Sequence, residues 1–127
     1  PLLRLALACS PGVEPASPNR YVCETIFRHV WLGGAEATDA QRLEALTQQL
    51  APLREPQGDE VKAQLRSNTE EAIALGVFGV PTFVVDGRIF WGLDALPMLR
   101  DYLLGDAWFD GPEWDAGANV RTGLKRQ

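Results

Sequence analysis

Hydrophobic residues recur at helical spacing through the first part of the chain and then change to the alternation typical of β-strands. The helical stretches end at glycine or proline, the residues that most often terminate helices. They cover residues 2–9, 20–34, 38–51 and 60–75. Thr38 and Gln41 have the spacing of a capping box for the third helix, and Asp59 is expected to cap the fourth.

A hairpin followed by a helix is expected next. The segments TFVV (82–85) and RIFW (88–91) flank Asp86-Gly87, a dipeptide typical of tight β-hairpin turns. Residues 93–105 then return to helical spacing, with Asp94 as the expected N-cap. Because an isolated hairpin is only marginally stable in water, this one must pack against a helix or further strands.

Composition and charge narrow the classes of function. The 127 residues are 46% hydrophobic, and 17 acidic against 12 basic side chains give a net charge of −5. Nucleic acid is not expected as a partner, because it requires a basic protein surface. No apolar run reaches the roughly 20 residues of a membrane span, so we expect a cytoplasmic protein with no membrane partner. Cys9 and Cys23 form neither a C-x-x-C redox pair nor a metal-ligand spacing, and no metal site is expected.

Pro81 stands at the start of the first expected strand. A proline here is consistent with a cis peptide bond after Val80, which would leave the main-chain N–H and C=O of Val80 free to pair with an extended peptide. The alternative is that Pro81 only keeps an edge strand from extending. The residues alone leave both interpretations open.

Two segments carry a resemblance to a known family. Residues 61–103, VKAQLRSNTEEAIALGVFGVPTFVVDGRIFWGLDALPMLRDYL, resemble the C-terminal half of the 2-hydroxychromene-2-carboxylate isomerases, relatives of the kappa-class glutathione transferases among the DsbA-type thioredoxin-like proteins. Residues 24–34, ETIFRHVWLGG, resemble their inserted helical domain. The most specific pieces are G-V-x-G-V-P-T (76–82) and F-W-G-x-D (90–94).

The resemblance implies an α/β fold, thioredoxin-like with an inserted helical domain. This chain would hold mostly helices, a β-hairpin and the C-terminal helix, and it would lack the N-terminal βαβ unit. We therefore expect it to be a piece of a longer protein. The implied domains are the C-terminal part of the helical insertion with its connecting helix (1–75), the thioredoxin-like ββα unit (76–105) and a C-terminal tail (106–127).

The resemblance also implies reduced glutathione as the cofactor. It places the main chain of Val80 against the cysteine moiety of glutathione and makes Pro81 the cis-proline. It puts Leu93 and Asp94 beside the γ-glutamyl group, although Asp94 can also simply cap its helix. Relatives often carry a polar residue at the position of Leu93, so only its N–H is expected to contribute. Trp91 is a candidate wall of the pocket for a small aromatic substrate, although a strand tryptophan is more often core.

The implied activity is a glutathione-dependent cis-trans isomerisation of the 2-hydroxychromene-2-carboxylate type, in aromatic degradation. In that family a serine at the start of the first helix of the βαβ unit activates the thiol. Ser10, Ser17 and Ser67 do not match that position, so the catalytic residue is unknown and the chain alone is expected to be inactive.

Two other functions stay open. A DsbA-type thiol-disulfide oxidoreductase would need a C-x-x-C motif upstream of this chain. A non-catalytic binding or assembly module would be completed by pairing its hairpin edge with another chain. Kappa-like relatives are often dimers, so a homodimer is one state that the resemblance allows.

Overall fold

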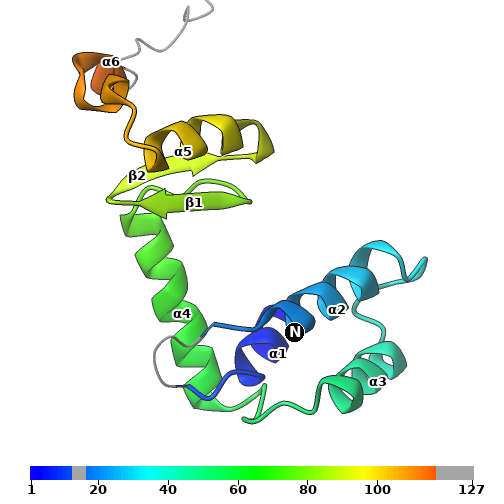
Figure 1. Cartoon of the computed structure of the whole chain (residues 1–127). Helices are drawn as coiled ribbons and strands as arrows, with labels where there is room; N and C mark the ends of the chain where they lie inside the picture. The colour runs from blue at the N-terminus through cyan, green and yellow to red at the C-terminus, as the bar shows by residue number, and fades with distance from the viewer. Residues whose placement is uncertain (13–16, 117–127) are drawn as a thin grey trace, which may run out of the picture. The chain divides into compact units, whose positions relative to one another are not determined.

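The computed structural model describes residues 1–12 and 17–116, and the chain divides into two compact units, residues 1–74 and 75–127. The first unit is helical and the second contains the hairpin (Figure 1). Each unit has its own hydrophobic core. Among the described residues, no helix combines the length and the apolar character needed to cross a bilayer.

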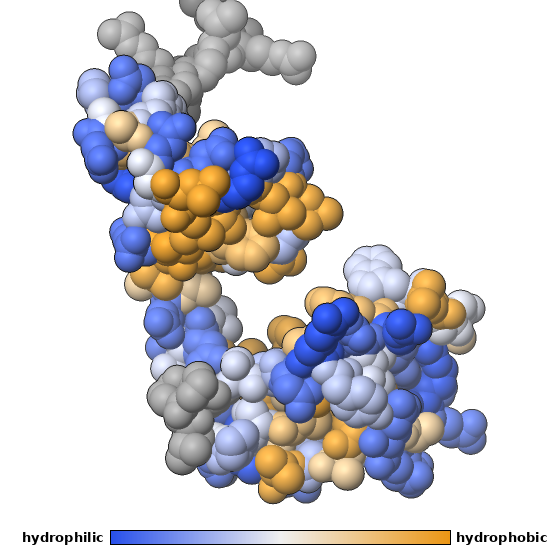
Figure 2. All heavy atoms as spheres, viewed as in Figure 1, coloured by the Kyte–Doolittle hydropathy of each residue, from blue (hydrophilic) through white to orange (hydrophobic). Residues whose placement is uncertain are grey.

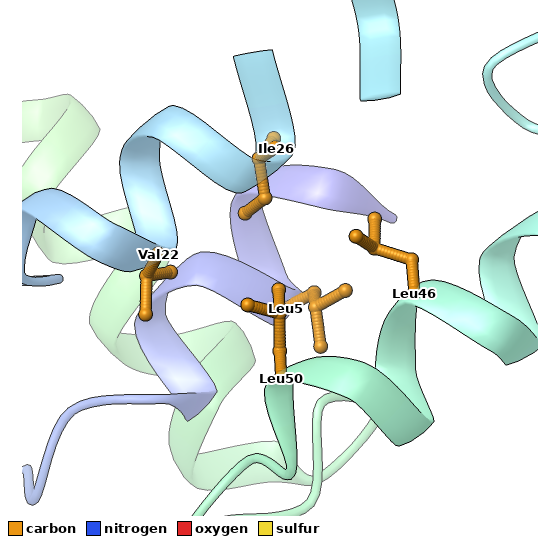
Figure 3. Packing of buried hydrophobic residues seen from close by; sticks show 5 residues of the cluster. All are labelled: Leu5, Val22, Ile26, Leu46 and Leu50. Carbon is orange, nitrogen blue, oxygen red and sulfur yellow. The ribbon is translucent and has the colours of Figure 1, made fainter. Parts of the chain in front are cut away.

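The four expected helices all form in the first unit. They are α1 (Leu2–Ala8), α2 (Arg20–Trp31), α3 (Ala40–Leu50) and α4 (Asp59–Ala74). The residues that recur at helical spacing meet in the core: Leu5 of α1, Val22 and Ile26 of α2, and Leu46 and Leu50 of α3 (Figure 3). A second cluster joins Leu7 and Ala8 of α1 to Val61 of α4.

The expected starts of α3 and α4 are wrong by one residue. Asp39, not Thr38, is the N-cap of α3, and its Oδ1 accepts from the Arg42 N–H at 3.0 Å. The Thr38 hydroxyl instead donates to Glu36 Oε1 at 2.8 Å. Asp59 is the first residue of α4 rather than its cap.

Arg54 joins α1 to α4 within the helical unit. Its guanidinium donates to the main-chain oxygens of Leu7 at 2.6 Å and Ser10 at 3.0 Å. These oxygens lie at the C-terminal end of α1, where the hydrogen bonds within the helix stop. It also donates to Glu60 at 2.9 Å and Gln64 at 2.7 Å, both on α4. The Arg54 side chain is only 11% exposed. Its planar fork thus satisfies the end of one helix while holding a second helix beside it.

We predict that Arg54→Lys destabilises the helical unit by about 1–3 kcal/mol, because one ammonium cannot replace the charged hydrogen bonds of the fork. Urea unfolding followed by helical circular dichroism measures this change. The matched control is Arg20→Lys, since Arg20 is 90% exposed and, within the described part of the chain, pairs only with Glu24 on its own helix. Equal stability of the two variants would contradict the role given to Arg54.

The second unit is built on a two-stranded antiparallel sheet. Strands β1 (Thr82–Val85) and β2 (Arg88–Trp91) pair with Val85 opposite Arg88 and Thr82 opposite Trp91. The turn residues Asp86 and Gly87 both have positive φ, 50° and 76°, as a type I′ turn requires. The expected hairpin is confirmed, with the expected strand bounds.

One face of the hairpin packs against α5 (Leu96–Leu103), and Phe90 is the centre of that contact. Phe90 is 1% exposed and clusters with Leu99 of α5 and with Phe109. Phe109 lies on a short 3-10 helix, η2 (Ala107–Asp110), which is followed by α6 (Pro112–Ala116). The sequence shows no period in this region. Its aromatic side chains nevertheless complete the core, because Trp114 of α6 also lies against Phe90, with ring centroids 5.4 Å apart.

Arg88 and Tyr102 fasten the hairpin to these helices. The Arg88 guanidinium lies over the rings of Tyr102 and Trp114, 5.0 and 5.6 Å from their centroids, and donates to the Phe109 main-chain oxygen at 2.9 Å. The Tyr102 hydroxyl donates to Asp86 Oδ2 at 2.6 Å. This hydrogen bond raises the pKa of Tyr102 above its usual value, because the phenol must stay protonated to donate.

We predict that Tyr102 loses its proton only above the ordinary tyrosine pKa of about 10. Because the folded-state pKa is raised, the contribution of Tyr102 to stability is present below the unfolded-state pKa and is lost as pH rises through the folded one. Tyr21→Phe leaves Tyr102 as the single tyrosine, so ultraviolet absorbance follows it directly. Asp86→Asn in that background should lower the pKa of Tyr102, and an unchanged titration would contradict the assignment.

Candidate functional site

The hairpin ladder ends at Pro81, at the end of the hairpin away from the turn. The Gly92 N–H donates to the Pro81 carbonyl at 2.9 Å, one pair beyond Thr82 and Trp91. Pro81 has no N–H with which to return this hydrogen bond, so the pairing stops there. The peptide bond between Val80 and Pro81 is cis.

Val80 lies just outside the ladder. Among residues 1–12 and 17–116, no hydrogen bond engages its N–H or C=O. Its side chain is 89% exposed. The Thr82 hydroxyl donates to the Gly79 main-chain oxygen at 2.5 Å. This hydrogen bond joins the two residues that flank Val80 and Pro81. Val80 therefore presents one donor and one acceptor from a loop that is held at both ends.

The expectation that Asp94 caps the last helix is wrong. A 3-10 turn, η1 (Leu93–Ala95), starts after Gly92, and α5 starts after Ala95; neither helix has a side-chain cap. Gly92 has φ 86°, which turns the chain out of the strand before a cap can form. Within the described part of the chain the Asp94 carboxylate accepts no hydrogen bond, and the Leu93 N–H donates none.

Asp94 borders an open hollow of about 400 Å³ beside the start of α5. Asp101 and Asp106 contribute two more carboxylates to it, so the hollow is acidic. Pro97, Met98, Trp108 and Phe109 supply the rest of its lining. Val80, Pro81, Trp91 and Leu93 are not part of this lining. These four residues and Asp94 lie at or next to the open end of the hairpin, where Thr82 pairs with Trp91, but only Asp94 borders the hollow.

Trp91 is not a core residue. Its side chain is 53% exposed, on the face of the hairpin opposite Phe90. Its indole lies against the ring of Phe78, with centroids 5.0 Å apart and planes tilted by 53°. Hydrophobic residues gather on this unit (Figure 2), and Phe78, at 72%, is among its most exposed.

The sequence analysis did not identify Phe78 and Gly79 as candidate site residues. Periodicity could not find them, because they lie in a loop. The available signal was the composition G-V-F-G immediately before Val80, an aromatic residue between glycines where a loop is ordinarily polar.

The described residues hold no evident group for activating a thiol. Ser10 is buried, donates to the Leu7 main-chain oxygen at 2.8 Å and accepts from Arg54, which is a structural role. Cys9 and Cys23 are free and half-buried. Burial raises the pKa of the Cys9 thiol, the opposite of what a reactive thiol needs. In residues 1–12 and 17–116 no three His, Cys, Asp or Glu side chains gather as metal ligands would.

Comparisons of the sequence with known proteins identify one relative and a family. A curated relative, called 2-hydroxychromene-2-carboxylate isomerase, from Sphingobium xenophagum, is 30% identical over 86 residues. That match covers 61% of this chain and 43% of the relative, so the chain spans less than half of the relative's length. No solved structure matches the chain.

The family model described as the DSBA-like thioredoxin domain matches residues 10–104, most of the chain. The hairpin and α5 lie within that match, and they form the sheet-and-helix part of a thioredoxin-like fold. The chain therefore belongs to the DSBA-like thioredoxin domain family.

Proposed function

We propose that this chain forms the glutathione-binding part of a cis-trans isomerase that acts on 2-hydroxychromene-2-carboxylate or a similar conjugated aromatic acid. The observation that carries the proposal is the main chain of Val80 at the end of the hairpin ladder, which has no hydrogen-bond partner among residues 1–12 and 17–116. The name of the 30% identical relative supports the reaction class.

Val80 suits the cysteine moiety of glutathione because that residue carries one main-chain N–H and one C=O, the complement of the groups that Val80 presents. Its free N–H and C=O can form two antiparallel hydrogen bonds with one residue of the tripeptide, as in strand addition. Such pairing recognises the main chain of the ligand and leaves its thiol free to react.

Asp94 suits the ammonium of the γ-glutamyl group. Its carboxylate is exposed and has no partner among the described residues, and Asp101 and Asp106 add negative charge to the same hollow. A charge-assisted hydrogen bond from an ammonium is therefore favourable there. The Leu93 N–H, which donates no hydrogen bond within the described part of the chain, can donate to the γ-glutamyl carboxylate.

The proposed reaction needs an addition and its reversal. The glutathione sulfur forms a bond to the conjugated substrate, a double bond becomes single and rotates, and the carbon–sulfur bond then breaks to return the thiol. The residues described here would hold the tripeptide and orient its sulfur. Activation of the thiol would come from a group outside the described residues.

We predict that reduced glutathione binds to the protein and that Asp94→Asn weakens binding by about 1–3 kcal/mol, the value of a charged hydrogen bond. Isothermal calorimetry gives both affinities. In the whole protein, isomerisation of 2-hydroxychromene-2-carboxylate should require added glutathione. Glutathione-independent turnover, or equal affinities of the two proteins, would contradict the proposal.

We also predict that Asp94→Ala leaves the free energy of unfolding within about 0.5 kcal/mol of the original, because this carboxylate holds no helix end. Asp39→Ala is the matched comparison, since it removes a real N-cap and should cost about 1 kcal/mol. Chemical denaturation measures both. A larger loss for Asp94→Ala than for Asp39→Ala would show that Asp94 is structural.

A further inference from the structure

The loop before Val80 folds back over the face of the hairpin that α5 leaves free. A Cβ on Gly76 would lie 3.5 Å from Ile89 Cδ1, and a Cβ on Gly79 would meet the indole of Trp91. Ile89 and Trp91 both point to the face opposite Phe90. Gly79 therefore allows the loop to approach this face closely, whereas a Cβ on Gly76 would make only an ordinary van der Waals contact.

The backbone conformation at residue 79 does not require a glycine, since Gly79 is not among the glycines with positive φ. The close contact with Trp91 requires it instead. A Cβ at this position would clash with Trp91 Nε1 and would lie 3.1 Å from Cε2 and 3.3 Å from Cδ1. These atoms belong to a rigid ring, so any side chain at residue 79 must push the whole indole away. Gly79 thus fixes where the Trp91 ring lies relative to Val80.

Phe78 completes an aromatic surface with Trp91. Both rings are more than half exposed, yet they lie in contact with each other. Phe78 is two residues before Val80, whose main chain has no hydrogen-bond partner among residues 1–12 and 17–116. Tilted rings at this separation offer adjacent faces and edges to a third, flat ring. Tyr102, Phe109 and Trp114 pack around Phe90 instead.

We propose that Phe78 and Trp91 together receive the planar ring of the conjugated acid, and that Gly79 is a positioning residue that sets this aromatic pair beside the bound thiol. This inference rests on the proposed function. It adds that the preference for a planar aromatic substrate depends on Phe78 and Gly79 and is independent of the groups that hold glutathione. The occupant is the ring of the substrate because Val80 and Asp94 account for the tripeptide, and Phe78 lies two residues before Val80 in the same loop.

The test separates affinity for the ring from affinity for the tripeptide. In the whole protein, Phe78→Ala and Gly79→Ala should each raise the KM for 2-hydroxychromene-2-carboxylate by about tenfold, the loss of one aromatic contact. Calorimetry should find the Kd of glutathione unchanged in both. Phe27→Ala, which removes another exposed phenylalanine from α2, should change neither value.

Two results would overturn the inference: an unchanged KM in Phe78→Ala, or a KM and a glutathione Kd that rise together in that variant. Phe78→Ala decides the matter even if Gly79→Ala does not fold, because Phe78 is exposed and its loss leaves the core intact. A wild-type protein that binds no glutathione would count against the proposed function instead, and binding of the aromatic acid alone would still be measurable by calorimetry.

Discussion

The hydrogen bond from the Gly92 N–H to the Pro81 carbonyl is the last link of the hairpin ladder, and the candidate site depends on it. It fixes the start of β1 beside the end of β2. It cannot be continued, because Pro81 lacks an N–H and Gly92 turns the chain into η1. In this antiparallel register the residue before Pro81 falls at a position that exchanges no hydrogen bonds with β2. Val80 therefore keeps a donor and an acceptor that a ligand can use.

The rest of the hairpin unit holds this end in place. Phe90 anchors β2 to α5, and Tyr102 ties the turn to the same helix through Asp86. Arg88 binds the main chain of the η2 segment while lying over two aromatic rings. Because the turn and the core are fixed, the open end presents Val80 and Asp94 from a rigid support, which lowers the entropy lost when a ligand binds.

Much of the fold could be predicted from the sequence, because periodicity reports which residues share a buried face. The leucines of α3 and the Asp86-Gly87 turn gave clear signals of this kind. Helix starts were less accurate, since Thr38, Asp39 and Asp59 all carry capping side chains and sequence alone does not choose among them. The packing around Phe90 could not be predicted, because Phe109 and Trp114 reach the core from short helices whose sequence shows no hydrophobic periodicity. At the site, the resemblance supplied Val80 and Asp94, but only the structure shows that Asp94 caps nothing and that Phe78 lies on Trp91.

The most direct measurement is the nuclear magnetic resonance spectrum of the main-chain amides during a titration with reduced glutathione. We predict that the Val80 and Leu93 amide signals shift and saturate together, because both N–H groups gain a partner, while Asp86 and Gly87 at the distant turn stay unchanged. Saturating glutathione that leaves Val80 and Leu93 unshifted, or that shifts mainly the amides of α2 and α3, would contradict a peptide-binding end of the hairpin.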